Sequence, residues 1–245
     1  MRNYFIFDGH DSRDYDVYIS GQKTFDSPER KYKLYDVPGR NGSIAEDGKS
    51  FKNIELAYED SFIADAPYLP QDFDRAFSDL KNFLLSRSGY CRLEDSYHNA
   101  EYRLAIFRKA IQPAMNDENT FGTFDLIFEC KPQRYLKNGE TKQTITSFSG
   151  AQISNFTNFA SLPLIRVYGN GTVGIGSYSF VVSNNADNYI DIDCDVMDCF
   201  REAANMNQNV VFTNHEMPKL LPGNNGITAT SGITKIEITP RWFII

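Results

Sequence analysis

The sequence predicts a mainly β protein of the β-rich α+β class, with an N-terminal β domain that carries one amphipathic helix and a C-terminal β-sandwich. Three observations support this prediction. The chain holds 19 Phe and 14 Tyr against a single Trp, and Phe and Tyr favour half-buried strands. Short apolar segments, separated by Gly, Asn, Asp and Pro, recur along the whole chain. Only one stretch has the apolar spacing of a long helix.

The N-terminal half contains several predicted strands, before and after that helix. They are NYFIFDG, DYDVYIS and FKNIELAYE, then GYCRLEDS, EYRLAIFRKAI and FGTFDLIFECKPQ. The segment YKLYDVPGRNGSI places Pro38, Gly39, Asn41 and Gly42 between two apolar runs. These residue types favour a tight reversal of the chain. The segment therefore predicts a protruding hairpin, called the arm below.

The predicted helix begins near Asp72, a good N-cap residue, and ends at about residue 87. Gly89 follows as a natural stop. The apolar residues recur at the spacing i, i+3, i+4, i+7 and so form one stripe. They are Phe73, Ala76, Phe77, Leu80, Phe83 and Leu84. Because a lone amphipathic helix must cover its stripe, we expect it to pack on the N-terminal strands.

A domain boundary is predicted between residues 136 and 137, where polar residues and the pair Asn138-Gly139 interrupt the apolar pattern. The domains are then residues 1–136 and 137–245. The second domain holds short strands at the spacing typical of a β-sandwich. These strands are PLIRVYG, GIGSYSFVVS, YIDIDCD, QNVVF and GITKIEITPRWFII.

Charge and hydropathy exclude several classes of partner. The formal net charge is -7 at pH 7, whereas specific binding of nucleic acid needs clustered Lys and Arg. No apolar run approaches the roughly 20 residues of a membrane span, and the N-terminal run is too short for a signal peptide. We therefore expect folding in a cytoplasm, no membrane partner, and free thiols at the four cysteines.

The segment VYGNGTVGIG resembles a dinucleotide-binding fingerprint, since Gly169, Gly171 and Gly174 have the spacing G-x-G-x-x-G. That fingerprint needs a helix after its third glycine, whose amides hold the pyrophosphate. The residues after Gly174 are β-branched and aromatic with period two, which predicts a strand. We therefore interpret the segment as a hairpin in which Asn170-Gly171 supplies positive φ angles.

Four carboxylates match part of a calcium-binding loop. Asp191, Asp193, Asp195 and Glu202 occupy positions 1, 3, 5 and 12 of the EF-hand pattern, but Val196 replaces the glycine required at position 6. An EF-hand loop also lies between two helices, and the residues that flank this segment are not predicted to be helical. We interpret the segment as a solvated strand end that carries alternate carboxylates on one face.

No catalytic motif was found in the sequence. The patterns HExxH, G-x-S-x-G and the Walker lysine are absent, and Cys194 and Cys199 lack the C-x-x-C spacing of a redox pair. His10, His98 and His215 are expected in turns or on the surface. A pair of carboxylates for glycoside hydrolysis is not excluded by the sequence, because the sequence does not show the distance between them. The prediction is a protein that is not an enzyme and holds no cofactor or metal.

A set of segments follows a specific order along the chain: FIFDGHDSRDYDVYISG, VPGRNGSI, LKNFLLSRSGYCRLEDSYHNAEYRLAIF, FDLIFECKPQRYLKNGE, SLPLIRVYGNGTVGIG, IDIDCDVMDCF and a closing segment that ends in TPRWFII. In this order they resemble the distal tail protein family of long-tailed phages of Gram-positive bacteria, almost from end to end. Asp16 departs from the family pattern, in which a glycine is expected. No further carbohydrate-binding insertion interrupts the chain.

The resemblance implies an N-terminal domain that forms a hexameric ring and a peripheral, galectin-like C-terminal sandwich. It implies a structural virion protein of the tail tip, assembled in the host cytoplasm, that joins the tail tube to the baseplate. The implied partners are further copies of the chain, the tail tube protein, a tail-associated hub or lysin protein, and receptor-binding proteins. DNA would pass through the ring without specific binding.

By the same resemblance, the tip of the arm is a candidate for contact with a neighbouring subunit. The candidate residues are Pro38, Gly39, Arg40, Asn41 and Gly42. The alternative for them is a free hairpin tip. Trp242 is expected in the core, while the last strand, with Arg241, lies either in the core or at the seam between the domains.

Two other functions compete with a structural hub. One is a carbohydrate-binding β-sandwich for attachment to the host cell wall, and the other is an enzyme, either nucleotide-dependent or a cell-wall hydrolase. Sugar-binding galectins rely on a Trp platform, whereas here the one Trp lies in the last strand and His215 lies in a turn-like segment. We therefore expect no lectin activity.

Overall fold

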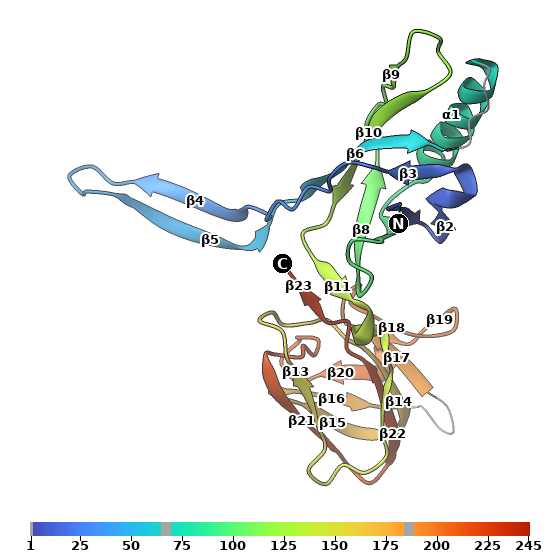
Figure 1. The fold of residues 1–245 in the computed structure, drawn as a ribbon. Coiled ribbons are helices and arrows are strands. Elements are labelled where there is room, and N and C mark those ends of the chain that lie inside the picture. The colour runs from blue at the N-terminus through green and yellow to red at the C-terminus, as the bar shows by residue number, and fades with distance from the viewer. Residues whose placement is uncertain (1, 65–69, 184–188) are drawn as a thin grey trace. The chain divides into compact units, whose positions relative to one another are not determined.

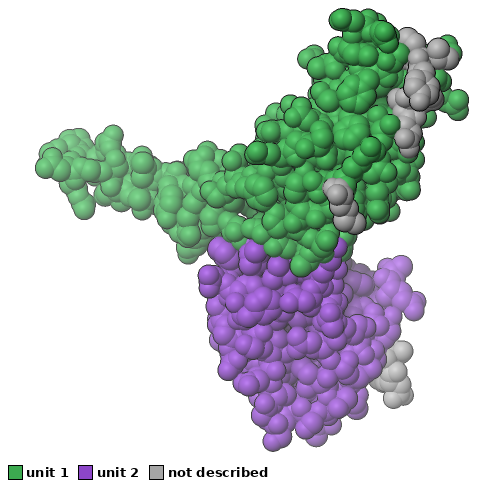
Figure 2. Space-filling view, viewed as in Figure 1, with its two compact units in different colours: residues 1–134, 245 green, residues 135–244 purple. Residues whose placement is uncertain are grey.

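The computed structural model describes residues 2–64, 70–183 and 189–245. The chain forms two compact units, residues 1–134 with residue 245 (unit 1) and residues 135–244 (unit 2) (Figure 2). Strands dominate both units, as predicted, and α1 (Pro70–Leu85) is the one α-helix of the described residues (Figure 1).

Unit 1 is built on an antiparallel sheet with the strand order β2-β1-β7-β8-β10-β6-β3, with β9 paired to β10. The bounds are β1 Phe5–Phe7, β2 His10–Asp11, β3 Val17–Ile19, β6 Ile54–Ile63, β7 Cys91–Asp95, β8 Glu101–Phe107, β9 Ala114–Met115 and β10 Gly122–Cys130. The longest strands alternate buried and exposed residues, as half-buried strands do. This alternation gives the sheet one apolar face.

Helix α1 buries its apolar stripe against the core of unit 1. Phe73, Phe77, Leu80, Phe83 and Leu84 are buried and belong to the same cluster as the inward side chains of the sheet. The rings of Phe77 and Phe124 lie 5.3 Å apart, and those of Phe7 and Phe83 lie 6.2 Å apart. Burying each such ring contributes about 1.5–3 kcal/mol, so packing on the sheet stabilises the predicted helix.

Asp16 has a left-handed backbone, with φ of 54°. It caps a short 3-10 helix (Ser12–Tyr15), and its N–H donates to the carbonyl of Arg13 at 3.0 Å. Asp is one of the few residue types besides Gly that tolerate this conformation. The departure from the expected glycine therefore leaves the turn intact.

The arm forms the predicted hairpin. Strands β4 (Arg30–Asp36) and β5 (Ser43–Phe51) pair only with each other and make a separate two-stranded sheet within the described residues. Figure 1 shows them as a long blue ribbon outside the main sheet of unit 1. All seven residues of β4 are exposed.

Unit 2 is a β-sandwich of two antiparallel sheets, with the strand orders β12-β22-β14-β17-β18-β19 and β13-β21-β15-β16-β20. Alternate side chains of both sheets form one apolar cluster, which includes Trp242 at 3% exposure. This confirms the prediction that Trp242 lies in the core. The bounds are β12 Gln143–Ile145, β13 Gln152–Asn155, β14 Leu164–Gly169, β15 Gly171–Ile175, β16 Tyr178–Val182, β17 Tyr189–Asp193, β18 Asp198–Arg201, β19 Ala204–Asn205, β20 Val210–Phe212, β21 Gly223–Ala229 and β22 Ile233–Thr239. Strands β11 (Arg134–Leu136) and β23 (Phe243–Ile244) belong to neither sheet of the sandwich and pair with each other.

The glycine-rich segment does not form the predicted hairpin. Strands β14 and β15 flank Asn170 but belong to different sheets, so the turn carries the chain from one layer of the sandwich to the other. Gly169 and Gly171 have positive φ angles of 96° and 145°, whereas Asn170 does not. A Cβ on Gly169 would lie 2.2 Å from the carbonyl oxygen of Gly232. Gly169 is therefore required by a close approach of two backbones.

Candidate functional site

The five interface candidates, residues 38–42, lie in the turn between β4 and β5 and are all exposed. The N–H of Arg40 donates to the carbonyl of Val37 at 3.1 Å. Gly39 and Gly42 have φ angles of 80° and 76°, a conformation that glycine adopts without steric cost. The local sequence thus determines the turn and leaves its side chains available to a partner.

The arm carries a concentration of exposed apolar side chains. Those above a third exposed are Tyr32, Leu34, Tyr35, Val37 and Ile44. Leu34 pairs with Ala45 and Tyr35 with Ile44, so apolar groups occupy both faces of the hairpin, because successive side chains point to opposite faces. Grouped apolar side chains of this kind mark interaction surfaces on soluble proteins.

Polar contacts between side chains join the two strands of the arm. Arg30 forms an ion pair with Asp47 at 2.5 Å, and the hydroxyl of Tyr35 donates to Glu46 at 2.7 Å. Such exposed contacts add little stability, and an isolated two-stranded hairpin is marginal in water. The arm therefore gains most if a partner covers it.

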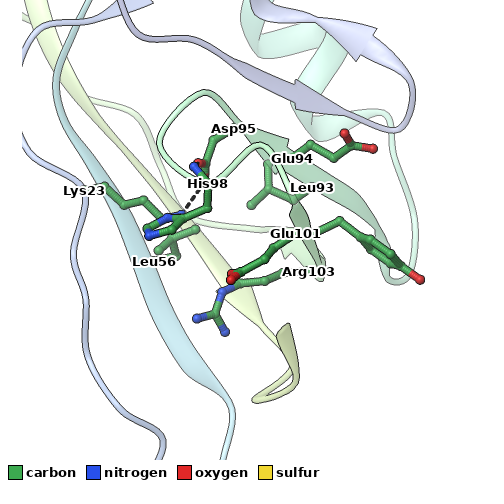
Figure 3. A pocket seen from close by; sticks show the side chains of 9 residues that line it. Lys23, Leu56, Leu93, Glu94, Asp95, His98, Glu101 and Arg103 are labelled. Atoms are coloured by element: carbon green, nitrogen blue, oxygen red, sulfur yellow. Dashed lines mark hydrogen bonds and ion pairs between the residues drawn. The ribbon is translucent and has the colours of Figure 1, made fainter. Parts of the chain in front are cut away.

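A second concentration of functional groups lies inside unit 1 (Figure 3). Lys23, which follows β3, places its Nζ 2.5 Å from Oδ2 of Asp95 and 3.2 Å from Nδ1 of His98. The hydroxyl of Tyr58 donates to the same Asp95 oxygen at 2.9 Å. Because an ammonium group only donates, Nδ1 of His98 accepts this bond and its Nε2 carries the proton. We call these four residues the Lys23 cluster.

Burial determines the ionisation of the Lys23 cluster. It lowers the pKa of Lys23, and the nearby Asp95 carboxylate offsets only part of that effect. Burial, followed by the charge of Lys23, lowers the pKa of His98. The pKa of Tyr58 lies well above its usual value because the phenol is buried and adjoins Asp95. At neutral pH the cluster therefore holds a paired Lys23, a neutral His98 and a protonated Tyr58.

The sequence predicted His98 in a turn or on the surface, and the structure has it in a turn, with a side chain that is not fully exposed. His98 lies in the turn after β7, where Asp95 accepts the N–H groups of Tyr97 and His98, but its side chain is half-buried against Lys23. Lys23 and Asp95 are 72 residues apart, so no local pattern indicated their contact. His10 and His215 are exposed, as predicted.

Two of the four carboxylates of the EF-hand-like segment, Asp191 and Asp193, are buried, which corrects the prediction of a solvated face, whereas Asp195 and Glu202 are exposed. Asp191 is 4% exposed and accepts two bonds from Arg166, at 2.7 and 2.8 Å. Asp193 is 8% exposed and accepts two bonds from Arg241, at 2.6 and 2.8 Å. Burial raises the pKa of Asp193, but the bonds from Arg241 outweigh it and keep the pKa below its usual value. The oxygens of Asp191 and Asp193, which a metal ion would need as ligands, are therefore already bound to arginine side chains.

Among the residues that the structure describes, no group of three or more His, Cys, Asp or Glu side chains is arranged to hold a metal ion. The cysteines are free, and burial raises the pKa of each of them, in Cys130 and Cys199 to about 12. Thiols of this kind stay protonated at neutral pH. Within the same residues, no helix has the length and hydropathy needed to cross a membrane.

Comparisons with known proteins give matches among solved structures only. No family model matches the chain, and no curated protein does. The hub protein Dit of phage SPP1, described as a paradigm of the hub adsorption apparatus of phages that infect Gram-positive hosts, has a TM-score of 0.78 at 16% identity, with both chains covered completely. Chains of the phage P2 baseplate in its activated conformation, with Ca and with Sr, have TM-scores of 0.55 and 0.54 at 13% and 12% identity, with 97% of each chain covered.

These likenesses establish the fold of the chain. The match to the SPP1 hub protein extends over both units and leaves no part of either chain uncovered. The resemblance to distal tail proteins, inferred from the order of segments, is thereby confirmed at the level of the fold.

Proposed function

We propose that this chain is a structural virion protein of a long-tailed phage, a distal tail protein whose copies form a hexameric ring at the tail tip. The complete two-unit likeness to the SPP1 hub protein carries this proposal. Unit 1 would form the ring, and unit 2 would be the galectin-like sandwich at its periphery. The ring would join the tail tube to the baseplate, the tail-associated hub or lysin protein and the receptor-binding proteins, with DNA passing through it.

The arm supports this role. Its apolar side chains on both faces need a partner, and residues 38–42 at its tip are the proposed contacts to a neighbouring subunit. A heterologous contact of this type, repeated by rotation, closes a ring. Assembly would take place in the host cytoplasm, and the finished protein would belong to the virion.

A structural role without catalysis also fits the polar groups of the chain. In the Lys23 cluster and in the two arginine–aspartate pairs, charged side chains bind each other. For the carbohydrate-binding alternative, the one Trp is 3% exposed in the core. The guanidinium of Arg166 lies 3.9 Å from the ring centroid of Tyr189, and Nζ of Lys235 lies 3.9 Å from that of Tyr168. Cations thus cover faces on which a sugar would stack.

The test is the mass and shape of the purified full chain. Light scattering should give six subunits, and negative-stain images should show a ring with a central hole. The variant Tyr32→Ser/Leu34→Ser/Ile44→Ser removes apolar groups of the arm and should remain a folded single subunit. Val211→Ser, at an exposed strand residue of unit 2, is the matched control and should still form rings. A mass of one subunit for the wild type at every concentration, even with tube protein added, would refute the proposal.

A further inference from the structure

Unit 1 contains a cavity of about 110 Å³ beside the Lys23 cluster. Its lining includes residues 23–28, the segment that leads from β3 towards the arm, together with His98, Arg103 and Arg134. Figure 3 shows Lys23, His98 and Arg103 of these walls from close by. We call this space the arm-base cavity.

Three cationic side chains line the arm-base cavity, and two of them have carboxylate partners. Lys23 binds Asp95, and Arg134 binds both oxygens of Glu101 at 2.8 Å each. Arg103 differs from both. Its one hydrogen bond within the described residues is a long contact of 3.5 Å to the carbonyl of Pro132, and no carboxylate there lies within 4.0 Å of it.

The position of Arg103 is energetically unfavourable for an unpaired charge. The residue is half-buried on β8, and burial lowers its pKa. Removing a guanidinium from water without an anion beside it costs free energy. The wall also holds one carboxylate, Asp26, which is exposed and forms no ion pair within the described ranges. Since Asp95 and Glu101 neutralise Lys23 and Arg134, Arg103 is the cation of the cavity walls that lacks a carboxylate partner within the described residues.

The chemistry of the walls fits an oxyanion. A guanidinium presents a planar fork that matches two oxygens of a carboxylate, phosphate or sulfate. The hydroxyl of Thr24 already accepts the N–H of Ala57, at 2.8 Å, and keeps its own proton for donation. A volume of about 110 Å³ accommodates a group of this size.

We propose that the arm-base cavity binds a small oxyanion group on Arg103, with Lys23 and Thr24 as further donors. The group is either a free anion or the side-chain carboxylate of a neighbouring copy of the chain. The second source rests on the proposed ring, while the site itself does not depend on ring formation.

The test is a titration of inorganic phosphate into the full chain at constant ionic strength, set with chloride, followed by thermal unfolding. The wild type should unfold at a higher temperature as phosphate rises, because the anion binds only the folded state. In Arg103→Gln, phosphate affinity should fall about tenfold or more, since a charged hydrogen bond contributes about 1.5–3 kcal/mol. Without phosphate, this variant should be as stable as the wild type or more stable.

Arg108→Gln is the matched control, since Arg108 is 63% exposed on the same strand region and pairs with Glu129 outside the cavity. It should keep the full phosphate response. Light scattering distinguishes the two sources of the group. If phosphate inhibits ring formation by the wild type and Arg103→Gln forms no rings, a carboxylate of the neighbouring copy is the ligand. If the wild type with phosphate and Arg103→Gln both form rings normally, the ligand is a free anion. An equal rise of the unfolding temperature with phosphate in the wild type and Arg103→Gln would overturn the proposal that Arg103 binds the anion.

Discussion

Nζ of Lys23 lies 2.5 Å from Oδ2 of Asp95, and the two side chains are only 7% and 5% exposed. This pair ties the segment before the arm to the end of β7. A buried ion pair stabilises weakly as a whole, because both charges lose their hydration, but removing one partner leaves an uncompensated charge. The pair therefore makes the base of the arm sensitive to single substitutions.

Asp95→Asn should destabilise unit 1 by about 3–5 kcal/mol, because the ammonium of Lys23 stays buried without its carboxylate. The measurement is denaturant unfolding followed by far-UV circular dichroism. Fluorescence of Trp242, the one Trp, reports unit 2 and should change little. Glu29→Gln is the control, since its ion pair with Lys52 is exposed, and it should leave the midpoint nearly unchanged. Equal destabilisation by Asp95→Asn and Glu29→Gln would contradict the conclusion that burial makes the Lys23–Asp95 pair sensitive to loss of one partner.

His98 should make the stability of unit 1 depend on pH as the pH falls below about 6.5. Its folded pKa is below the usual 6.5, so the unfolded chain takes up a proton first as the pH falls. The free energy of unfolding should then decrease on acidification, by at most about 1.4 kcal/mol per pH unit. The groups that act on His98 are Lys23, Asp95, Glu101 and Arg134.

His98→Asn should remove this slope, because asparagine offers an acceptor to Lys23 and does not titrate in this range. His215→Asn should keep it, since His215 is exposed and its φ of 56° suits asparagine. Asp193 and Glu129 have lowered pKa values in the folded chain. The stability that they contribute is lost at more acidic pH, as the pH falls below their usual pKa values of 3.8 and 4.5. Unfolding midpoints measured at several pH values separate the two ranges. A slope that persists in His98→Asn would show that another group titrates.

Gly169→Ala should destabilise unit 2 by about 2–5 kcal/mol, through a disfavoured positive φ and an overpacked contact with Gly232. The new Cβ would lie 2.2 Å from a backbone oxygen, which cannot rotate away. Trp242 fluorescence during denaturant unfolding measures the loss. Gly150 also has a positive φ, of 70°, but a Cβ added there would meet open space. Gly150→Ala should therefore show only the cost of the disfavoured backbone conformation. If the two variants are equally stable, close approach is not the reason for Gly169.

The local patterns predicted the elements well. The stripe from Phe73 to Leu84 specified a helix and its buried face, and alternation along β6 and β10 specified which side chains enter the core. The same patterns misjudged Asp191 and Asp193. Polar residues in a strand indicate an exposed face, but Arg166 of β14 and Arg241, which lies between β22 and β23, cover these two carboxylates.

Local sequence patterns were enough to predict the fold class, the helix, the arm with its turn at residues 38–42, and the strand that excludes a dinucleotide site after Gly174. These features depend on residues near one another in the chain, whose backbone preferences and apolar period act locally. The Lys23 cluster, the lack of a carboxylate partner for Arg103 and the backbone contact between Gly169 and Gly232 became visible in the folded chain alone. Each of these joins residues tens of positions apart, and burial, which sets their charge and packing, exists only once the sheets have assembled.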